Sequence, residues 1–208
     1  TLVKHAELAM FEAKKVGGKS LKAFETGMDT RMTESHLLED GLHSALERTE
    51  FVLFYQPQVD IKTGRITGAE ALIRWQHPER GLLPPGSFIP IAEETDLIVR
   101  IGEWVLREAC EQASKWTAIG LPPILVSANI SARQFREKGL LEKMQKTIKR
   151  SGVNPGRICL ELTESVLMED PFAAIETIRS LKETGICLAL DDFGTGFSSL
   201  NYLRRFPV

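Results

Sequence analysis

The sequence has few cysteines and no long apolar run, and each scarcity excludes a class of protein. Only three of its 208 residues are cysteine, an odd and small number that excludes a disulfide-stapled secreted scaffold. All three lie in apolar stretches, as reduced core thiols do, so we expect a reducing, cytoplasmic setting. No stretch approaches the roughly 20 apolar residues that span a bilayer. The sequence therefore predicts no membrane segment.

Net charge of one sign is also lacking. Lys and Arg total 26 against 28 for Asp and Glu, which leaves a formal net charge of -2. Such a balance offers no general attraction for DNA, RNA or an anionic membrane, so we expect none of these as a partner. With 43% hydrophobic and 26% charged residues, the composition is that of an ordinary globular protein. Any anion-binding site must be local.

From residue 51 onward, β-rich apolar runs alternate with amphipathic helical patterns, which predicts an α/β protein. The residues between the first two strands are too few for a crossover helix, so these strands should pair antiparallel and the later ones parallel. This pattern leaves a doubly wound sheet and a (β/α) barrel both open. The expected strands are residues 51–60, 65–74, 124–130, 158–163 and 186–191, and the expected helices are residues 98–119, 133–150 and 171–184.

The first fifty residues follow a different pattern. Residues 2–15 place apolar side chains on one helical face and are followed by two glycines, a common C-terminal signal. A short strand at residues 20–25 and a second helix within residues 27–50 should follow. Because the sequence has no initiator Met and stops just after an apolar helical pattern, we expect it to be a piece of a larger protein.

Oxygen-bearing side chains interrupt the apolar strands, and these are the most informative residues. Glu70 and Glu161 each lie within an apolar run, and Asn129 ends another such run. Asp191 and Asp192 directly follow a fourth apolar run. Burying one unpaired carboxylate costs several kcal/mol, so a cavity lined by several needs cations. All the donors are oxygens, which favours Mg²⁺ or Mn²⁺ over zinc. Two adjacent aspartates suggest two metals roughly 3.5–4 Å apart, an arrangement that activates water against a phosphodiester.

Each of these residues, taken singly, has an ordinary structural alternative. A lone carboxylate at a strand end is more often a helix cap or an ion-pair partner, and only the agreement of four strands argues for function. Arg74 lies four residues after Glu70, on the same side of an extended strand, and is placed to hold a phosphate oxygen. Its alternative is a surface arginine.

In this order the motifs resemble those of EAL domains, the bacterial cyclic di-GMP phosphodiesterases. The resemblance extends from about residue 51 to residue 208 and implies a modified (β/α)8 TIM-like barrel with an antiparallel first strand. The family pattern continues past Val208 with a Lys-x-Asp strand and a further metal-binding Glu, so the barrel is expected to be incomplete in this chain. The motifs are Glu70-Ala71-Leu72 with Arg74, Asn129-Ile130-Ser131, Glu161-Leu162-Thr163-Glu164, and the run from Asp191-Asp192 to Leu200.

The resemblance implies a role for each matching residue. Glu70, Asp191 and Asp192 serve catalysis, and Glu164 braces the loop that follows Asp192. Two Mg²⁺ or Mn²⁺ ions are implied, with the second site incomplete in this chain. The implied metal ligands are Glu70, Asn129, Glu161, Asp191 and Asp192, and the implied substrate contacts are Gln56, Leu72 and Arg74.

The same resemblance implies an activity and partners. The expected reaction is metal-dependent hydrolysis of cyclic di-GMP to linear pGpG, and a homodimer is expected through the loop after Asp192. The alternative is a catalytically inactive EAL module that acts as a cyclic di-GMP receptor. Residues 1–26 resemble the last helix and strand of a GGDEF domain, which implies upstream GGDEF or sensor domains. Residues 27–50 are then a connecting helix and residues 51–208 the N-terminal part of an EAL domain.

Overall fold

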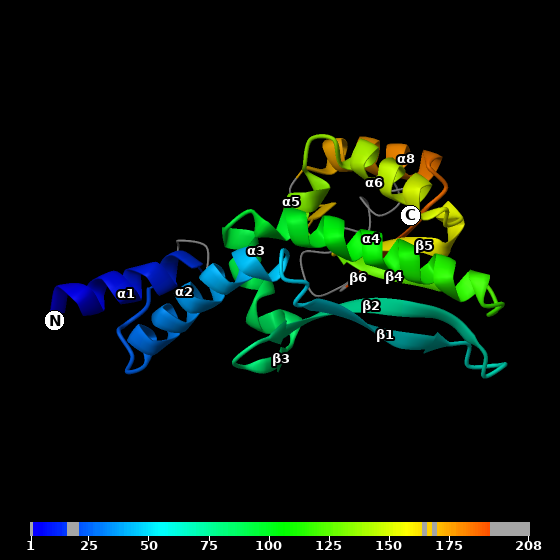
Figure 1. Ribbon diagram of the computed structural model, residues 1–208. Coiled ribbons are helices and arrows are strands. Elements are labelled where there is room, and N and C mark those ends of the chain that lie inside the picture. The colour runs from blue at the N-terminus through cyan, green and yellow to red at the C-terminus, as the bar shows by residue number, and fades with distance from the viewer. Residues whose placement is uncertain (1, 16–20, 164–165, 168–169, 192–208) are drawn as a thin grey trace.

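The computed structural model describes residues 2–15, 21–163, 166–167 and 170–191. Two helices, α1 (Leu2–Lys15) and α2 (Met28–Ala45), form an arm at one end of the molecule, and a sheet with helices against it forms the body (Figure 1). The strand expected at residues 20–25 is wrong, because residues 21–25 adopt no regular structure. Phe24 instead packs beside Ala9 of α1 and Met28 of α2.

The body is built on a six-stranded sheet with the order β1-β2-β4-β5-β6, in which β3 pairs with β2. The first two strands pair antiparallel, while β2 with β4, β4 with β5, and β5 with β6 are parallel, which confirms both expectations. In the part of the chain that the structure describes, the sheet is an open arc and does not close. The strands are β1 (Phe51–Val59), β2 (Ile66–His77), β3 (Gly81–Leu83), β4 (Leu125–Ile130), β5 (Ile158–Thr163) and β6 (Cys187–Asp191).

A tight turn sets the antiparallel register of β1 and β2. The Asp60 carboxylate accepts hydrogen bonds from the backbone N–H of Thr63 at 2.8 Å and from its hydroxyl at 2.7 Å. Gly64 has a φ of 69°, a left-handed conformation that glycine adopts without a steric penalty. This register places Gln56 opposite Glu70 and Phe54 opposite Leu72.

Helices cover one face of the sheet, which we call the outer face. In Figure 1, α4 (Leu97–Ala118) crosses in front of β4 and β5, and α6 (Leu140–Ser151) and α8 (Pro171–Glu183) lie above it. Asp170 caps α8 by accepting a hydrogen bond from the N–H of Ala173 at 3.2 Å, as the Asp-Pro sequence predicts. Shorter helices with described bounds are α3 (Ile89–Glu94), α5 (Ala132–Phe135), η1 (Pro85–Ser87) and η2 (Pro155–Arg157).

Three local expectations are corrected. The single helix expected at residues 133–150 is two helices, α5 and α6, because Gly139 adopts a φ of 84° between them. β2 extends to His77, and the short elements β3 and α3 were not expected. Glu70 lies inside β2, as the expected strand at residues 65–74 implied, and the parallel pairing of β2 with β4 stops one residue later, at Ala71.

Two apolar clusters stabilise the body. One lies between the outer face and helices α4, α6 and α8, and Val126, Ile158 and Leu162 are completely buried there. The other surrounds Trp75, whose indole N–H donates to the Glu50 carboxylate at 3.0 Å, and joins α2 to the sheet. All three cysteines are free thiols.

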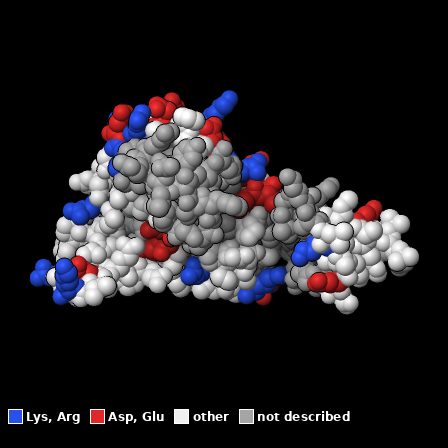
Figure 2. Space-filling view, turned by 180° about the vertical axis from the view of Figure 1, so that it is seen from behind, with Lys and Arg blue, Asp and Glu red and all other residues white. Residues whose placement is uncertain are grey.

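The surface and the helices of the described residues agree with the composition. The view from behind shows Lys, Arg, Asp and Glu interspersed over the described surface, without one continuous field of either sign (Figure 2). Among the helices that the structure describes, none has the length and apolarity needed to cross a bilayer.

Candidate functional site

The alternation of side chains along β2 separates the candidate site from the core. Glu70, Leu72 and Arg74 are half-buried on one face, while Ala71 and Ile73 are buried on the other, against the helices. Successive side chains in a strand point to opposite faces, so Glu70 and Arg74 share a face as expected. We call this the inner face.

Strand pairing brings the other predicted ligands to the same inner face. Glu70 pairs with Ser127, and Asn129 lies two residues beyond Ser127 on β4. Asn129 pairs with Glu161 of β5, and Asp191 of β6 pairs with the residue two positions beyond Glu161. Paired residues on neighbouring strands share a face of the sheet, and residues two positions apart on one strand also share a face. Four neighbouring strands therefore each present one oxygen-bearing side chain to the same space.

Direct contacts and charge link these four side chains. The Asn129 amide donates a hydrogen bond to Glu70 Oε1 at 2.8 Å, joining β4 to β2. Burial raises the pKa of the Glu161 carboxyl above its usual value, the Ser127 hydroxyl lowers it, and the carboxylates of Glu70 and Asp191 raise it further. Glu161 thus lies close enough to Glu70 and Asp191 for their charges to disfavour its ionised form.

Ser127 is a polar residue that the sequence motifs did not single out. It is only 2% exposed, and its hydroxyl has no hydrogen-bond partner of standard geometry, although it lies near enough to the Glu161 carboxylate to lower its pKa. A buried hydroxyl without a partner is uncommon. Its sequence signal is a serine two residues before Asn129 in an otherwise apolar strand.

The donor set fits a hard divalent cation. Glu70, Asn129, Glu161 and Asp191 offer only oxygens, the ligands that Mg²⁺ and Mn²⁺ prefer, and a cation relieves the repulsion that acts on Glu161. Within the described ranges, no three His, Cys, Asp or Glu side chains converge closely enough to form a metal site by themselves. Asp192 and Glu164, predicted to serve the same centre, lie outside the described residues.

The predicted substrate contacts also lie on the inner face. Arg74 donates through Nη1 to the carbonyl oxygen of Ile73 at 2.8 Å, and its guanidinium carbon lies 5.6 Å from the centre of the Phe54 ring. Gln56 pairs with Glu70 in register, and Leu72 pairs with Phe54. The three predicted contacts therefore line the same face as the predicted ligands, on the β1–β2 side.

A short segment that follows Asn129 at the end of β4 is fixed by its own hydrogen bonds, and the sequence motifs did not single it out. Ser131 and Gln134 form a capping box at α5, in which each side chain bonds the backbone N–H of the other residue. The guanidinium of Arg133 pairs with Asp96 and also donates to the Glu93 carbonyl oxygen at 2.9 Å. The signal was present, because Ser-x-x-Gln is a capping-box sequence.

Comparison with known proteins places this site in a family. The model of the EAL domain matches residues 39–208. A bifunctional diguanylate cyclase/cyclic di-GMP phosphodiesterase, MucR of Pseudomonas aeruginosa, is 43% identical over 207 residues, which is 100% of this chain and 30% of MucR. An uncharacterised protein of Sinorhizobium fredii, y4lL, is 42% identical over 206 residues, which is 99% of this chain and 24% of that protein.

Solved structures agree with the sequence comparisons. The MucR phosphodiesterase in complex with c-di-GMP superimposes with a TM-score of 0.80 at 45% identity, covering 83% of this chain and 70% of that one. The EAL enzyme Bd1971 in its cGMP-bound form superimposes with a TM-score of 0.78 at 32% identity, covering 88% and 51%. This chain spans about a quarter to a third of the length of its curated relatives. On its sequence, its fold and the motifs of its inner face, the chain belongs to the EAL domain family.

Proposed function

We propose that this chain carries most of the active site of a metal-dependent phosphodiesterase that hydrolyses cyclic di-GMP to linear pGpG. The observation that carries the proposal is the meeting of Glu70, Asn129, Glu161 and Asp191 on the inner face of four adjacent strands. Its similarity to MucR, whose name states this activity and whose structure contains c-di-GMP, supports the choice of substrate.

The residues of the inner face would have different roles in such a reaction. Glu70, Asn129, Glu161 and Asp191 would hold the cation, together with Asp192. When bound, Mg²⁺ or Mn²⁺ supplies a Lewis acid that lowers the pKa of water and stabilises charge on the phosphate. The Asn129–Glu70 hydrogen bond fixes the orientation of both side chains before anything binds.

Arg74 is placed to hold the phosphate. Its present partner is the neutral carbonyl oxygen of Ile73, and a phosphate oxygen forms a stronger, charge-assisted hydrogen bond with a guanidinium. The Phe54 ring beside it keeps the guanidinium on the inner face. Leu72 and Gln56, on the same face, would contact the nucleotide.

A receptor that binds cyclic di-GMP without cleaving it is the second candidate. It is supported by the c-di-GMP complex of the similar MucR phosphodiesterase, because that complex shows that a relative of this chain binds the nucleotide. A cleavage assay distinguishes the two candidate functions. A receptor needs only to bind the nucleotide, whereas a phosphodiesterase must also position a water molecule for attack.

The deciding experiment is a cyclic di-GMP hydrolysis assay on the longest natural form of the protein, with Mg²⁺ or Mn²⁺, beside calorimetric binding in Ca²⁺. We expect pGpG to form and to be lost in Asp191→Asn and Glu70→Gln while binding in Ca²⁺ remains measurable. Full turnover by Glu70→Gln would refute the mechanism. Tight binding without cleavage by the wild-type protein would establish the receptor instead.

We also propose the assembly that the sequence suggests. Residues 1–26 would end a GGDEF domain, residues 27–50 would connect it to the EAL domain, and the bifunctional name of MucR supports this order. The loop after Asp192 would form a homodimer interface. Sedimentation of the longest natural form, with and without cyclic di-GMP, tests the dimer, and a monomer under both conditions would refute it.

A further inference from the structure

Gly102, in the second turn of α4, lies directly against the side chain of Gln134. A Cβ built on Gly102 would overlap the side-chain amide nitrogen of Gln134 and would lie 2.7 Å from its Oε1. The backbone of Gly102 is helical, so size and not conformation requires glycine here. Glycine weakens a helix interior relative to alanine. Its presence is therefore explained by the close approach of Gln134.

Gln134 in turn fixes the start of α5. It is 8% exposed, and its Oε1 accepts hydrogen bonds from the backbone N–H of Ser131 at 3.2 Å and from the Ser131 hydroxyl at 3.0 Å. The N–H of Gln134 donates back to the Ser131 hydroxyl at 3.2 Å. A helix of four residues is not stable by itself, so α5 depends on these contacts.

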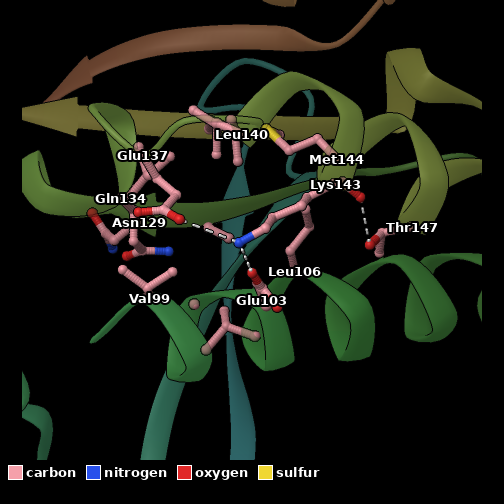
Figure 3. Close-up of a pocket in the computed structure, with 15 residues that line it drawn as sticks. Val99, Glu103, Leu106, Asn129, Gln134, Glu137, Leu140, Lys143, Met144 and Thr147 are labelled. Carbon is pink, nitrogen blue, oxygen red and sulfur yellow. Dashed lines mark hydrogen bonds and ion pairs between the residues drawn. The ribbon is translucent and has the colours of Figure 1, made fainter. Parts of the chain in front are cut away.

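Asn129 is only two residues before this anchored serine. Ile130 between them is buried, and the Asn129 amide reaches Glu70 on β2. Figure 3 shows Gln134 and Asn129 next to one another at one end of a cavity of about 40 Å³ that Gly102 also lines. Contacts thus lead from Gly102 through Gln134 to Ser131, and the backbone continues from Ser131 through the buried Ile130 to Asn129.

We propose that Gly102 and Gln134 are positioning residues that hold Asn129 in the orientation a divalent cation requires. The inference rests on the metal site of the proposed function and adds two residues that touch neither substrate nor cation. Because partners outside the ligand set orient metal ligands, their loss typically lowers metal affinity 10–100-fold. A larger residue at position 102 should affect Asn129 only by displacing the Gln134 side chain.

The test measures Mn²⁺ binding and thermal stability in the longest natural form of the protein. We compare the wild type with Gly102→Ala, Gln134→Ala and the double variant, and use Gly86→Ala as the control, because a Cβ at Gly86 meets nothing within 4 Å. The electron paramagnetic resonance signal of free Mn²⁺ gives affinity without any need for turnover. Differential scanning calorimetry gives the Tm.

We expect Gly102→Ala and Gln134→Ala each to weaken Mn²⁺ binding about tenfold and Gly86→Ala to leave it unchanged. The double variant should bind Mn²⁺ as Gln134→Ala does. The sign of the Tm change is diagnostic: Gly102→Ala should lower the Tm in the wild-type background and raise it in the Gln134→Ala background, where only the gain in helix propensity remains.

Three results would overturn the inference: a lower Tm with unchanged Mn²⁺ affinity, additive losses of affinity in the double variant, or no Mn²⁺ binding by the wild type. The first result would mean that the contact between Gly102 and Gln134 stabilises the fold but does not orient Asn129. A wild-type protein that binds Mn²⁺ but does not cleave cyclic di-GMP would refute the proposed phosphodiesterase alone, and the comparison of variants would still decide the role of Gly102 and Gln134.

Discussion

The outer and inner faces of the sheet are formed by the same strands and differ in almost every physical respect. On β5, Leu162 is completely buried against the helices, while its neighbour Glu161 lies half-buried on the inner face beside other carboxylates. The outer face buries apolar area, which stabilises the fold. The inner face concentrates charge, which costs stability. Adjacent residues of one strand therefore have different roles: one side chain stabilises the domain, and the next belongs to the proposed active site.

The largest effect should come from removing one inner carboxylate. Glu161→Gln should lower cleavage of cyclic di-GMP about 1000-fold, since metal stabilisation supplies several kcal/mol and each 1.4 kcal/mol is tenfold in rate. In chelator its free energy of unfolding at pH 7 should equal or exceed that of the wild type, because the raised pKa shows that the ionised form is disfavoured in the folded state. An unfolded Glu161→Gln protein would contradict the separation of the two faces.

The adjacent outer-face residue should behave in the opposite way. Leu162→Ala leaves a cavity beneath the helices and should cost about 2–5 kcal/mol of stability, measured by urea unfolding. In the fraction that remains folded, cleavage per molecule should stay within about threefold of the wild type, an effect of under about 1 kcal/mol. A selective loss of cleavage at full stability would show that this face takes part in the chemistry.

A smaller effect is expected at high pH from Tyr55, whose ring packs edge-on against Trp116 with the ring centres 4.9 Å apart. Burial, and to a lesser extent Glu108, raises the pKa of Tyr55 from 10.0 to about 12. Its stabilising contribution is complete below pH 10 and is lost as the pH rises through about 12. Relative to Tyr55→Phe, the wild type should lose about 1–2 kcal/mol between these limits, allowing for partial exposure.

Urea titrations of both proteins at a series of pH values measure that difference. Parallel curves for wild type and Tyr55→Phe across the whole range would show that the phenol is hydrated in the folded protein.

The smallest effect should come from the half-exposed ion pairs of Lys143, which link α6 to α4 and to Glu137. Lys143 lies 2.7 Å from Glu103 and 3.5 Å from Glu137, and its side chain is 44% exposed. Exposed pairs contribute about 0–1 kcal/mol, so Lys143→Ala should cost under about 1 kcal/mol in urea unfolding, and less at high salt. A larger cost that persists in salt would mean that Lys143 closes the cavity of Figure 3 through its packing.

Sequence reasoning succeeded where the signal is local. The β-rich apolar runs located β1, β2, β4, β5 and β6, and the short connection after β1 correctly predicted an antiparallel pair. It failed where a local signal was ambiguous: Gly139 divides an amphipathic pattern that reads as one helix. It also missed Ser127 and Gln134, because their importance comes from neighbours on other strands and helices.

The sequence by itself determined the α/β class, the EAL family and the oxygen-rich set of candidate ligands, since residue type and order along the chain carry that information. Only the tertiary structure decided that Glu70, Asn129, Glu161 and Asp191 share one face, and that Gln134, which bonds Ser131, packs directly against a glycine in α4. The physical reason is register. Which residues meet depends on how strands and helices pair over separations of tens of residues, and a slip of one residue in that pairing would turn each side chain to the other face.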